Sequence, residues 1–362
     1  MAPTASKNIL VLGGAGYIGS HVCRHLAASG YRPVTVDNLR TGYLRAVRWG
    51  PMEQADIGDE NLLGAIIEKH RPVAAIHMAA CIEAAESIKQ PSKYYRNNFS
   101  NSVVACDTLI RHGVNKLVFS GSAAVYGEPA TIPIPVSQPP APINPYGRSK
   151  LAVEWLLQDL AKAKGLKSYS LRYFNAAGAH PQGNIGEAHQ PETHLIPVLM
   201  DALSGRRERF CVFGTAFPTR DGTAERDFIH VDDLATAHVL ALERLLPDDS
   251  SDGWFKALNV GAGRGATVRE VVTTAMEILG IDCPIGEQVK PRPGDPARLI
   301  ADIKETSDHL HWSPERSDLK TIITDAWRFH DGARDAWLAD GRETLPHESQ
   351  PSKARRNRGV AD

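Results

Sequence analysis

The chain has 362 residues, 42% hydrophobic and 23% charged, with a formal net charge of −1 at pH 7. Such a chain can bury a large core without disulfides or metals, and its balanced charge gives no bulk attraction to nucleic acid or to an anionic membrane. No apolar run approaches the roughly 18 residues of a membrane span. The five cysteines show no zinc spacing, and a strand pattern starts too early to leave room for a signal peptide. We therefore expect reduced thiols and a cytoplasmic protein.

In the first half of the chain, strand-length apolar runs alternate with amphipathic stretches of helix length, a pattern typical of a parallel sheet covered by helices. Strands are predicted over residues 8–12, 33–36, 73–77, 116–120 and 168–174. Helices are predicted over 18–29 and 98–112, each followed by a glycine that can adopt a left-handed cap. The sequence thus predicts an α/β fold with a doubly wound parallel sheet.

Beyond about residue 181 this regularity weakens, because proline, glycine and charged residues become frequent over 181–193 and 289–298. Helical patterns persist at 231–246 and 267–279. We assign residues 1–180 to the sheet domain, with a segment of about 225–262 returning to it, and residues 181–345 mainly to a smaller C-terminal lobe. Residues 346–362 are basic and nearly without apolar side chains, which predicts a disordered, solvated tail and not a nucleic-acid site.

A glycine-rich loop, with Gly13, Gly16 and Gly19, follows the first strand and opens the first helix. Glycines at this spacing permit a tight turn, close approach of a pyrophosphate and packing of helix on strand, which is the Rossmann-type dinucleotide site. Asp37 ends the next strand, where its carboxylate can bind an adenosine ribose and repel a 2′-phosphate, so NAD is favoured over NADP. The alternative is a plain glycine turn with a loop-capping aspartate. Asp56, with Ile57, could border the adenine or could simply cap the helix of residues 60–70.

Tyr146 and Lys150 lie four residues apart in a helical pattern that ends at Gly165, so their side chains share one face. An ammonium about 4 Å from a phenol, at an effective dielectric constant of ~20, is worth about 4 kcal/mol, which would lower the phenol pKa by roughly three units. Tyr146 would then serve as a general base. Ser122, beyond the strand of residues 116–120, can share the substrate proton. The plainer alternative is a solvated helix face.

Together these motifs resemble the extended short-chain dehydrogenase/reductase family and, within it, the UDP-glucose 4-epimerases, from residue 8 to about residue 327. The resemblance rests on an ordered set of segments: the Gly13 loop, 37–39, 94–98, 120–127, the Tyr146/Lys150 pair, 172–175, 226–231 and 292–295.

The resemblance implies specific binding residues. Those for the cofactor are Gly13, Gly16, Tyr17, Ile18, Gly19, Asp37, Asn38, Asp56, Ile57, Ala79, Ala80, Asn98, Tyr146, Lys150 and Tyr173. Those for the substrate are Ser122, Tyr146, Asn175, His194, Leu195, Phe213, Arg226, Arg292 and Asp295. In this scheme Asn175 and Leu195 contact the UDP, Phe213 the uracil, Arg226 and Arg292 the diphosphate, and Asp295 the uridine ribose. A surface ion pair is the alternative for each arginine, and a turn for Asp295.

The implied activity is the interconversion of UDP-glucose and UDP-galactose by C4 epimerisation, through a transient 4-keto sugar and enzyme-bound NADH, in a homodimeric isomerase. UDP-N-acetylhexosamines or UDP-pentoses remain alternative substrates, because residues 81–87 depart from the pattern of some relatives. Leu299 aligns with a residue that gates the hexose pocket, although it could equally be core. A 4,6-dehydratase is disfavoured because Ala123 and Ala124 stand where an acid is needed. A non-catalytic NAD sensor would be expected to lack Tyr146 or Lys150.

No metal is expected. His21 and His25 share a helix face at metal-ligand spacing, but we expect them on a solvated surface without a third ligand.

Overall fold

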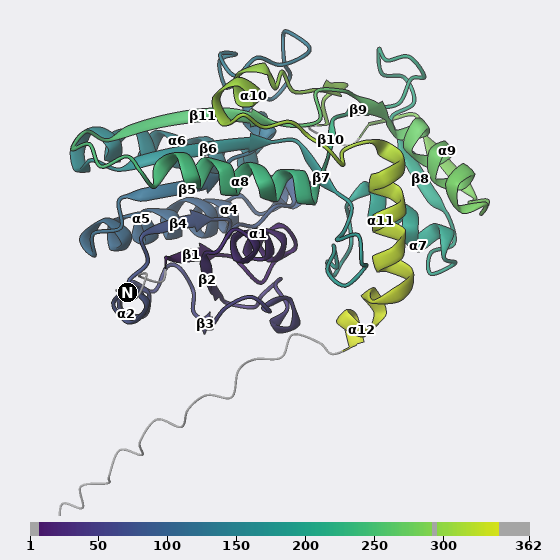
Figure 1. Ribbon diagram of the computed structural model, residues 1–362. Helices are drawn as coiled ribbons and strands as arrows, with labels where there is room; N and C mark the ends of the chain where they lie inside the picture. Colours follow the sequence, from purple (N-terminus) through teal and green to yellow (C-terminus); the bar gives the residue numbers. More distant parts are fainter. Residues whose placement is uncertain (1–6, 292–294, 340–362) are drawn as a thin grey trace, which may run out of the picture.

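The computed structural model describes residues 7–291 and 295–339. Its centre is a seven-stranded sheet in the order β11-β6-β5-β4-β1-β2-β3, and every neighbouring pair is parallel (Figure 1). The strands are β1 (Asn8–Leu12), β2 (Arg32–Asp37), β3 (Met52–Gln54), β4 (Ala74–His77), β5 (Lys116–Ser120), β6 (Lys167–Tyr173) and β11 (Trp254–Val260). The predicted doubly wound parallel sheet is confirmed.

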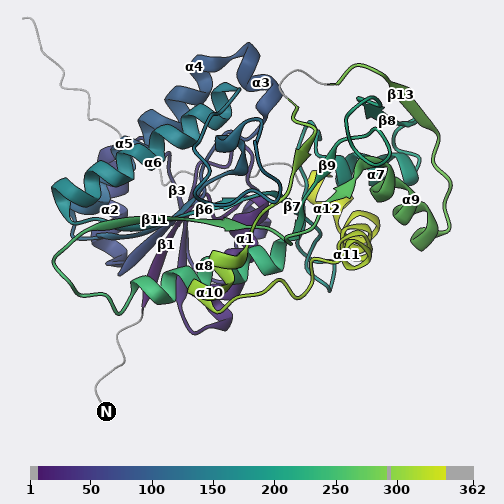
Figure 2. The same cartoon turned by 90° about the horizontal axis from the view of Figure 1, so that it is seen from above.

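Helices cover both faces of this sheet, as the view from above shows (Figure 2). One face carries α1 (Tyr17–Ala28), α8 (Val231–Leu245) and α10 (Lys304–Leu310), and the other carries α2 (Glu60–His70), α5 (Asn101–Arg111) and α6 (Pro145–Lys164). The alternation of side chains along a strand explains why β1 is apolar throughout. Ile9 and Val11 pack into the core on the α8 side, whereas Leu10 and Leu12 pack on the α2 side.

The carboxyl ends of β1, β4 and β5 meet at one edge of the sheet. The chain order reverses between β1 and β4, which is where open α/β sheets bind ligands. Short elements gather beyond this edge: α3 (Ala84–Lys89), α4 (Pro91–Tyr94), a π-helical turn η2 (Tyr95–Ser100) and a 3₁₀ turn η3 (Ala123–Tyr126). A further 3₁₀ turn, η1 (Leu44–Ala46), follows β2.

The C-terminal lobe packs helices against three small sheets and has its own core, which includes Ile196, Leu199, Val271 and Ile322. Its helices are α7 (Leu195–Leu203), α9 (Val268–Leu279), α11 (Leu319–Gly332) and α12 (Arg334–Ala339). The small sheets pair β7 (Asn175–Ala177) with β10 (Phe228–His230), β8 (Phe210–Phe213) with β13 (Ile285–Gln288), and β9 (Glu225–Arg226) with both β12 (Ala266–Thr267) and β14 (Arg298–Leu299). The domain boundaries given above stay a prediction.

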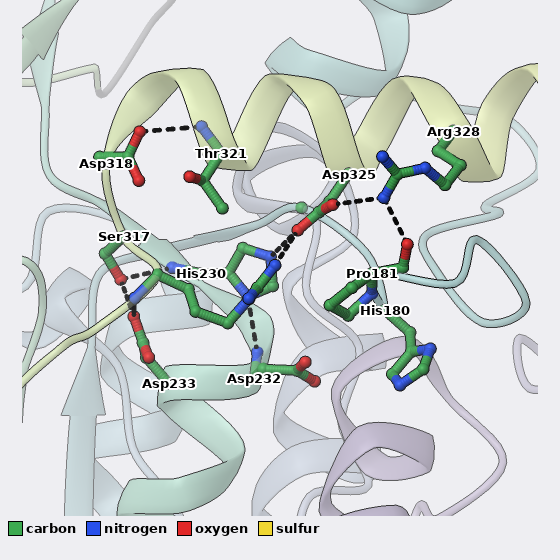
Figure 3. A network of polar contacts seen from close by, with 12 residues as sticks. His180, Pro181, His230, Asp232, Asp233, Ser317, Asp318, Thr321, Asp325 and Arg328 are labelled. Carbon is green, nitrogen blue, oxygen red and sulfur yellow. Dashed lines mark hydrogen bonds and ion pairs between the residues drawn. The ribbon is translucent and has the colours of Figure 1, made fainter.

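A buried polar network joins the lobe to the sheet domain (Figure 3). The Asp325 carboxylate on α11 lies 3.3 Å from Nε2 of the fully buried His230, which stands at the N-terminus of α8. Arg316 and Arg328 donate to the same carboxylate at 2.6 and 3.0 Å. The hydroxyl of Ser317 donates to Asp233 at 2.5 Å and accepts a hydrogen bond from the backbone N–H of His230. Charge-assisted bonds therefore tie α11 to α8.

The helix predicted over 98–112 is present, although it begins within the π-helical turn η2 and becomes regular α-helix only at Asn101. The expectation of a solvated surface was wrong for His21. His21 is fully buried, and its Nδ1 lies 2.8 Å from Oδ1 of Asp232, with His25 Nε2 3.3 Å from the same oxygen. Asp232, which contacts both histidines, belongs to α8 and lies more than 200 residues away along the chain. None of the helices in the described part of the chain is long and apolar enough to cross a membrane.

Candidate active site

The glycine loop is a crowded turn between β1 and α1. Gly13 has φ +87°, and a Cβ on it would lie 2.6 Å from the backbone N of Ala79, which follows β4. A Cβ on Gly19 would lie 2.2 Å from the Gly13 carbonyl oxygen. By contrast, a Cβ on Gly16 would meet only the Gly13 carbonyl oxygen, at 3.4 Å. The loop thus brings helix and strand together and leaves open the side on which the free N–H groups of α1 are available to an anion.

Two aspartates shape the neighbouring loops. Asp37, at the end of β2, accepts hydrogen bonds from the backbone N–H groups of Ala15 (3.1 Å) and Leu39 (2.9 Å), and burial raises its pKa. Asp56 accepts from Asn38 Nδ2 (2.9 Å) and Asn101 Nδ2 (3.0 Å). The proposed capping role of Asp56 was wrong, because Asp59 caps α2 by accepting from the N–H of Leu62. Ile57 is buried in the core on the α2 face.

Asn98, in the π-helical turn, fixes the loop that follows β4. Its amide accepts from the backbone N–H of Cys81 at 2.7 Å and donates to the Cys81 carbonyl at 2.9 Å and to the Ser149 hydroxyl at 3.1 Å. Tyr17 similarly holds the start of the lobe, since its hydroxyl donates to the Gly178 carbonyl at 2.7 Å. Ala79 and Ala80 follow the end of β4 at His77, and the backbone of Ala79 lies against Gly13 of the glycine loop.

The predicted catalytic side chains converge beyond the carboxyl end of β5. Tyr146, in the first turn of α6, is 8% exposed, and the Ser122 hydroxyl lowers the pKa of its phenol against the effect of burial. Ser122 Oγ accepts from the N–H of Ala124 and so caps the η3 turn, which begins at Ala123. The ring of Tyr94 packs edge-on against Tyr146, with centroids 6.4 Å apart. Tyr173 ends β6, and burial raises its pKa.

Lys150 lies one turn further along α6, and only 2% of it is exposed. Its ammonium donates to the backbone carbonyl of Ser120 at 2.8 Å and lies 4.9 Å from the centre of the Phe119 ring. Burial lowers the pKa of Lys150 to about 8.

The electrostatic expectation for Tyr146 was wrong. Burial raises the pKa of the phenol, and the neighbouring Ser122 hydroxyl offsets this only in part. Because the Lys150 ammonium is engaged by the Ser120 carbonyl, the lysine alone does not make the phenolate accessible. A second positive charge is needed in the site.

On the lobe side, Arg226 is buried and its guanidinium bonds with Asp295 and with the Glu225 carbonyl. Arg226 is therefore not a surface ion pair. Leu299 pairs with Arg226 across β14 and β9 and packs against the cluster of Ala123 and Val125, close to Ser122. Arg292 lies outside the described residues.

The other predicted substrate residues lie at the ends of helices and strands of the lobe. Asn175 is exposed at the start of β7, Phe213 ends β8, and His194 and Leu195 open α7. Sequence reasoning missed the carboxylates around His194. Its Nδ1 lies 3.0 Å from Glu187 and 3.1 Å from Glu192, and these ion pairs hold the pKa of the imidazole above its usual value against the effect of burial.

A family model described as the NAD dependent epimerase/dehydratase family matches residues 9–261, from β1 into the loop after β11. The chain belongs to this family. The glycine loop, Ser122, Tyr146 and Lys150 all fall inside the matched region.

The similarity to individual relatives covers nearly all of this epimerase. The UDP-glucose 4-epimerase of Rhizobium leguminosarum bv. trifolii is 47% identical over 326 residues, which are 90% of this chain and 98% of the relative. The structure of UDP-glucose 4-epimerase from Brucella ovis in complex with NAD has a TM-score of 0.86 and 45% identity and covers 90% of this chain and 98% of its own. The enzyme from Stenotrophomonas maltophila, with bound NAD and formylated UDP-arabinopyranose, has a TM-score of 0.86 and 37% identity, with coverages of 91% and 99%.

The resemblance predicted from the motifs is thus confirmed. This epimerase is an isomerase, and its cofactor is NAD.

Proposed function

We propose that this epimerase interconverts UDP-glucose and UDP-galactose by inverting C4 of the hexose through a transient 4-keto sugar. The observation that carries the proposal is the convergence of Ser122 and the buried Tyr146 in one site, where Ser122 acts on the pKa of the phenol and is followed by Ala123 and Ala124 in the η3 turn. An acid beside the hydroxyl pair would promote loss of water, whereas alanines favour reversible oxidation. The names of the relatives described above support the same reaction.

The residues of the sheet edge fit NAD. The tight turn that only glycine permits at Gly13 and Gly19, the open side of the loop at Gly16, the free N–H groups of α1 and the carboxylate of Asp37 are what a dinucleotide requires. When bound, oxidised NAD supplies a two-electron acceptor and, through its charged nicotinamide ring, the second positive charge that Tyr146 needs.

In the proposed reaction Tyr146 removes the proton of the C4 hydroxyl and returns it after the keto sugar has turned over. Ser122 shares this proton, and Lys150 stabilises the phenolate. Such a positioned base contributes about 10²–10⁴-fold to the rate. We assign Arg226 to the diphosphate and Asp295 to the uridine ribose, with Asn175, His194, Leu195 and Phe213 completing the nucleotide pocket. Holding the nucleotide and not the hexose leaves the sugar free to turn.

The direct test gives the purified protein UDP-galactose without added cofactor and measures UDP-glucose with a coupled dehydrogenase. Turnover is expected, because NAD is retained through the cycle. Parallel assays with UDP-N-acetylgalactosamine and UDP-arabinose identify the preferred sugar. Absence of product from UDP-galactose, with turnover of another sugar, would reject the glucose/galactose assignment.

Tyr146→Phe should lower kcat by at least about 100-fold and leave bound NAD unchanged, because the ring stays in place and only the proton acceptor is lost. Turnover is measured by the coupled assay, and NAD by its absorbance after denaturation. Full activity in this variant would show that another group is the base.

The homodimer is also a proposal. Trp155 on α6 is 58% exposed, and large aromatic side chains are enriched in protein interfaces. Sedimentation velocity should give a dimer for the native chain and a monomer for Trp155→Glu, because a charge would be buried in the interface. A monomeric native chain would refute the homodimer.

A cytoplasmic location is proposed as well, supported by five cysteines that are all free thiols.

A further inference from the structure

We propose that the loop before α7 is a binding site for a divalent zinc-type ion, with Glu187, His189, Glu192 and His194 as ligands. One potential ligand atom from each of these four side chains lies within 4.8 Å of all the others. In the described part of the chain, this is the only group of three or more His, Cys, Asp or Glu residues that meets this criterion.

The spacing of the ligand atoms suits a small tetrahedral ion. Glu187 Oε1 lies 3.1 Å from His189 Nδ1 and 3.0 Å from His194 Nδ1. Glu192 lies 3.1 Å from His194 Nδ1 through Oε1 and 3.9 Å from His189 Nδ1 through Oε2. Zinc bonds of about 2.0–2.1 Å in a tetrahedron require neighbouring ligands about 3.3 Å apart. The observed separations bracket that value, so small side-chain shifts suffice.

One of these atoms makes no hydrogen bond. Among the described residues, the buried Nδ1 of His189 has no hydrogen-bond partner, although Glu187 Oε1 lies 3.1 Å from it as an ion-pair neighbour. A buried ring nitrogen without a hydrogen bond is costly in a finished structure. Coordination by a metal ion would satisfy it.

The charges also match. Glu187 is 8% exposed and the Glu192 side chain only 3%. A divalent ion would displace the proton that these carboxylates favour on His194. The two carboxylates with two neutral imidazoles then carry a charge of −2, which the ion neutralises. The two nitrogen ligands favour zinc over magnesium, which prefers six oxygen ligands.

Surrounding groups would orient the ligands. Glu192 Oε1 accepts from the backbone N–H groups of Thr193 (2.9 Å) and His194 (3.0 Å), and its Oε2 accepts from the backbone N–H of His189 at 3.3 Å. A carboxylate oxygen has two lone pairs, so Oε2 keeps one for an ion. The other ring nitrogen of His194 faces Glu83 Oε1 at 3.9 Å, and Thr193 donates to the same carboxylate at 2.6 Å. A carboxylate behind a ligating histidine is the usual support of a zinc ligand. The ion would thus fix the loop that leads into Leu195 and α7.

The test uses the full chain without a histidine tag, treated with a chelator and dialysed. Equilibrium dialysis against Zn²⁺ should give one ion per chain, and Mg²⁺ should not bind. Co²⁺ should give the intense visible absorption of a tetrahedral complex. His189→Gln and Glu187→Gln should weaken Zn²⁺ binding at least about 100-fold, because each removes a direct ligand.

His25→Gln is the matched control, since His25 belongs to the other histidine pair, with His21 and Asp232. It should bind Zn²⁺ like the native chain. Zinc should raise the melting temperature of the native chain and of His25→Gln but not of His189→Gln. The proposal is overturned if the native chain binds no stoichiometric zinc, if His189→Gln binds normally, or if His25→Gln loses the ion. If His189→Gln does not fold, a weak octahedral cobalt spectrum in the native chain overturns it equally.

Discussion

Lys150 shows how a single side chain is prepared for chemistry by burial. Its ammonium has one backbone carbonyl as partner and an aromatic ring beside it, and its pKa falls to about 8. In the unfolded chain the pKa is about 10.4. Between these two pH values the unfolded state binds more protons than the folded state, so the free energy of unfolding increases as the pH rises. Below about pH 8 both states are charged, and the cost of burying the ammonium is constant.

We therefore expect the free energy of unfolding of the cofactor-free chain, relative to Lys150→Met, to rise by on the order of 3 kcal/mol between pH 8 and pH 10.5. Urea unfolding of both proteins across this range measures the difference. Lys164→Met, which alters an exposed lysine at the end of the same helix, should show no such trend. A difference that does not change with pH would mean that Lys150 is not charged and buried as described.

At the scale of elements, the π-helical turn η2 matters because it aims Asn98 at the loop after β4. Asn98→Ala would leave the N–H and carbonyl of Cys81 without their partner. Each unsatisfied buried group costs about 1–3 kcal/mol, so the free energy of unfolding should fall by about 2–4 kcal/mol and less NAD should be retained. Urea unfolding and NAD content test this. Gln90→Ala, on the exposed surface nearby, is the control, and equal behaviour of the two variants would contradict the role of Asn98.

Elements with a strong local signal were predictable, while partners from distant parts of the chain were not. β1 and β5 lie at their predicted bounds because each is a short apolar run between turn residues. The α6 helix places Tyr146 and Lys150 as their spacing predicts. The burial of His21 depends on Asp232 in α8, and the pKa of Tyr146 depends on how deeply β5 and Tyr94 enclose it. The spacing of His21 and His25 along a helix does not indicate the burial of His21. Likewise, the spacing of Tyr146 and Lys150 does not indicate the pKa of Tyr146.

The cluster of carboxylates and histidines in the loop before α7 was also not predicted from the sequence. His189 and His194 are separated by a proline turn, and only the folded loop brings both next to Glu187 and Glu192. The sequence-based expectation of no metal considered the spacing of the cysteines and of the histidines on a regular helix face, and neither pattern includes this loop.

For the whole molecule, the junction between lobe and sheet depends on Asp325 (Figure 3). Asp325→Asn would leave the buried His230 and two arginines without their anion, which should lower the free energy of unfolding by about 3 kcal/mol at pH 7. Burial opposes ionisation of Asp325, but His230 and Arg316 together lower its pKa. Its contribution is therefore complete above the unfolded pKa of about 3.9 and is lost as the pH falls below that value.

Urea unfolding of the native chain and of Asp325→Asn at pH 7 and pH 3 should show a difference that shrinks in acid. Asp331→Asn, an exposed position on the same helix, should match the native chain at both values. A variant as stable as the native chain at pH 7 would show that other contacts hold the lobe.

The position of β11 in the sheet also bears on how the chain is made. β11 pairs with β6 along seven residues, yet it begins only at Trp254, after α7, β8 and α8 have been synthesised. On the ribosome, β6 therefore has an open edge while the first part of the lobe emerges. Such an edge is a template for wrong pairing with other chains. In the cell, β6 must therefore avoid wrong pairing until β11 has been synthesised, and the sheet of this epimerase can be completed only then.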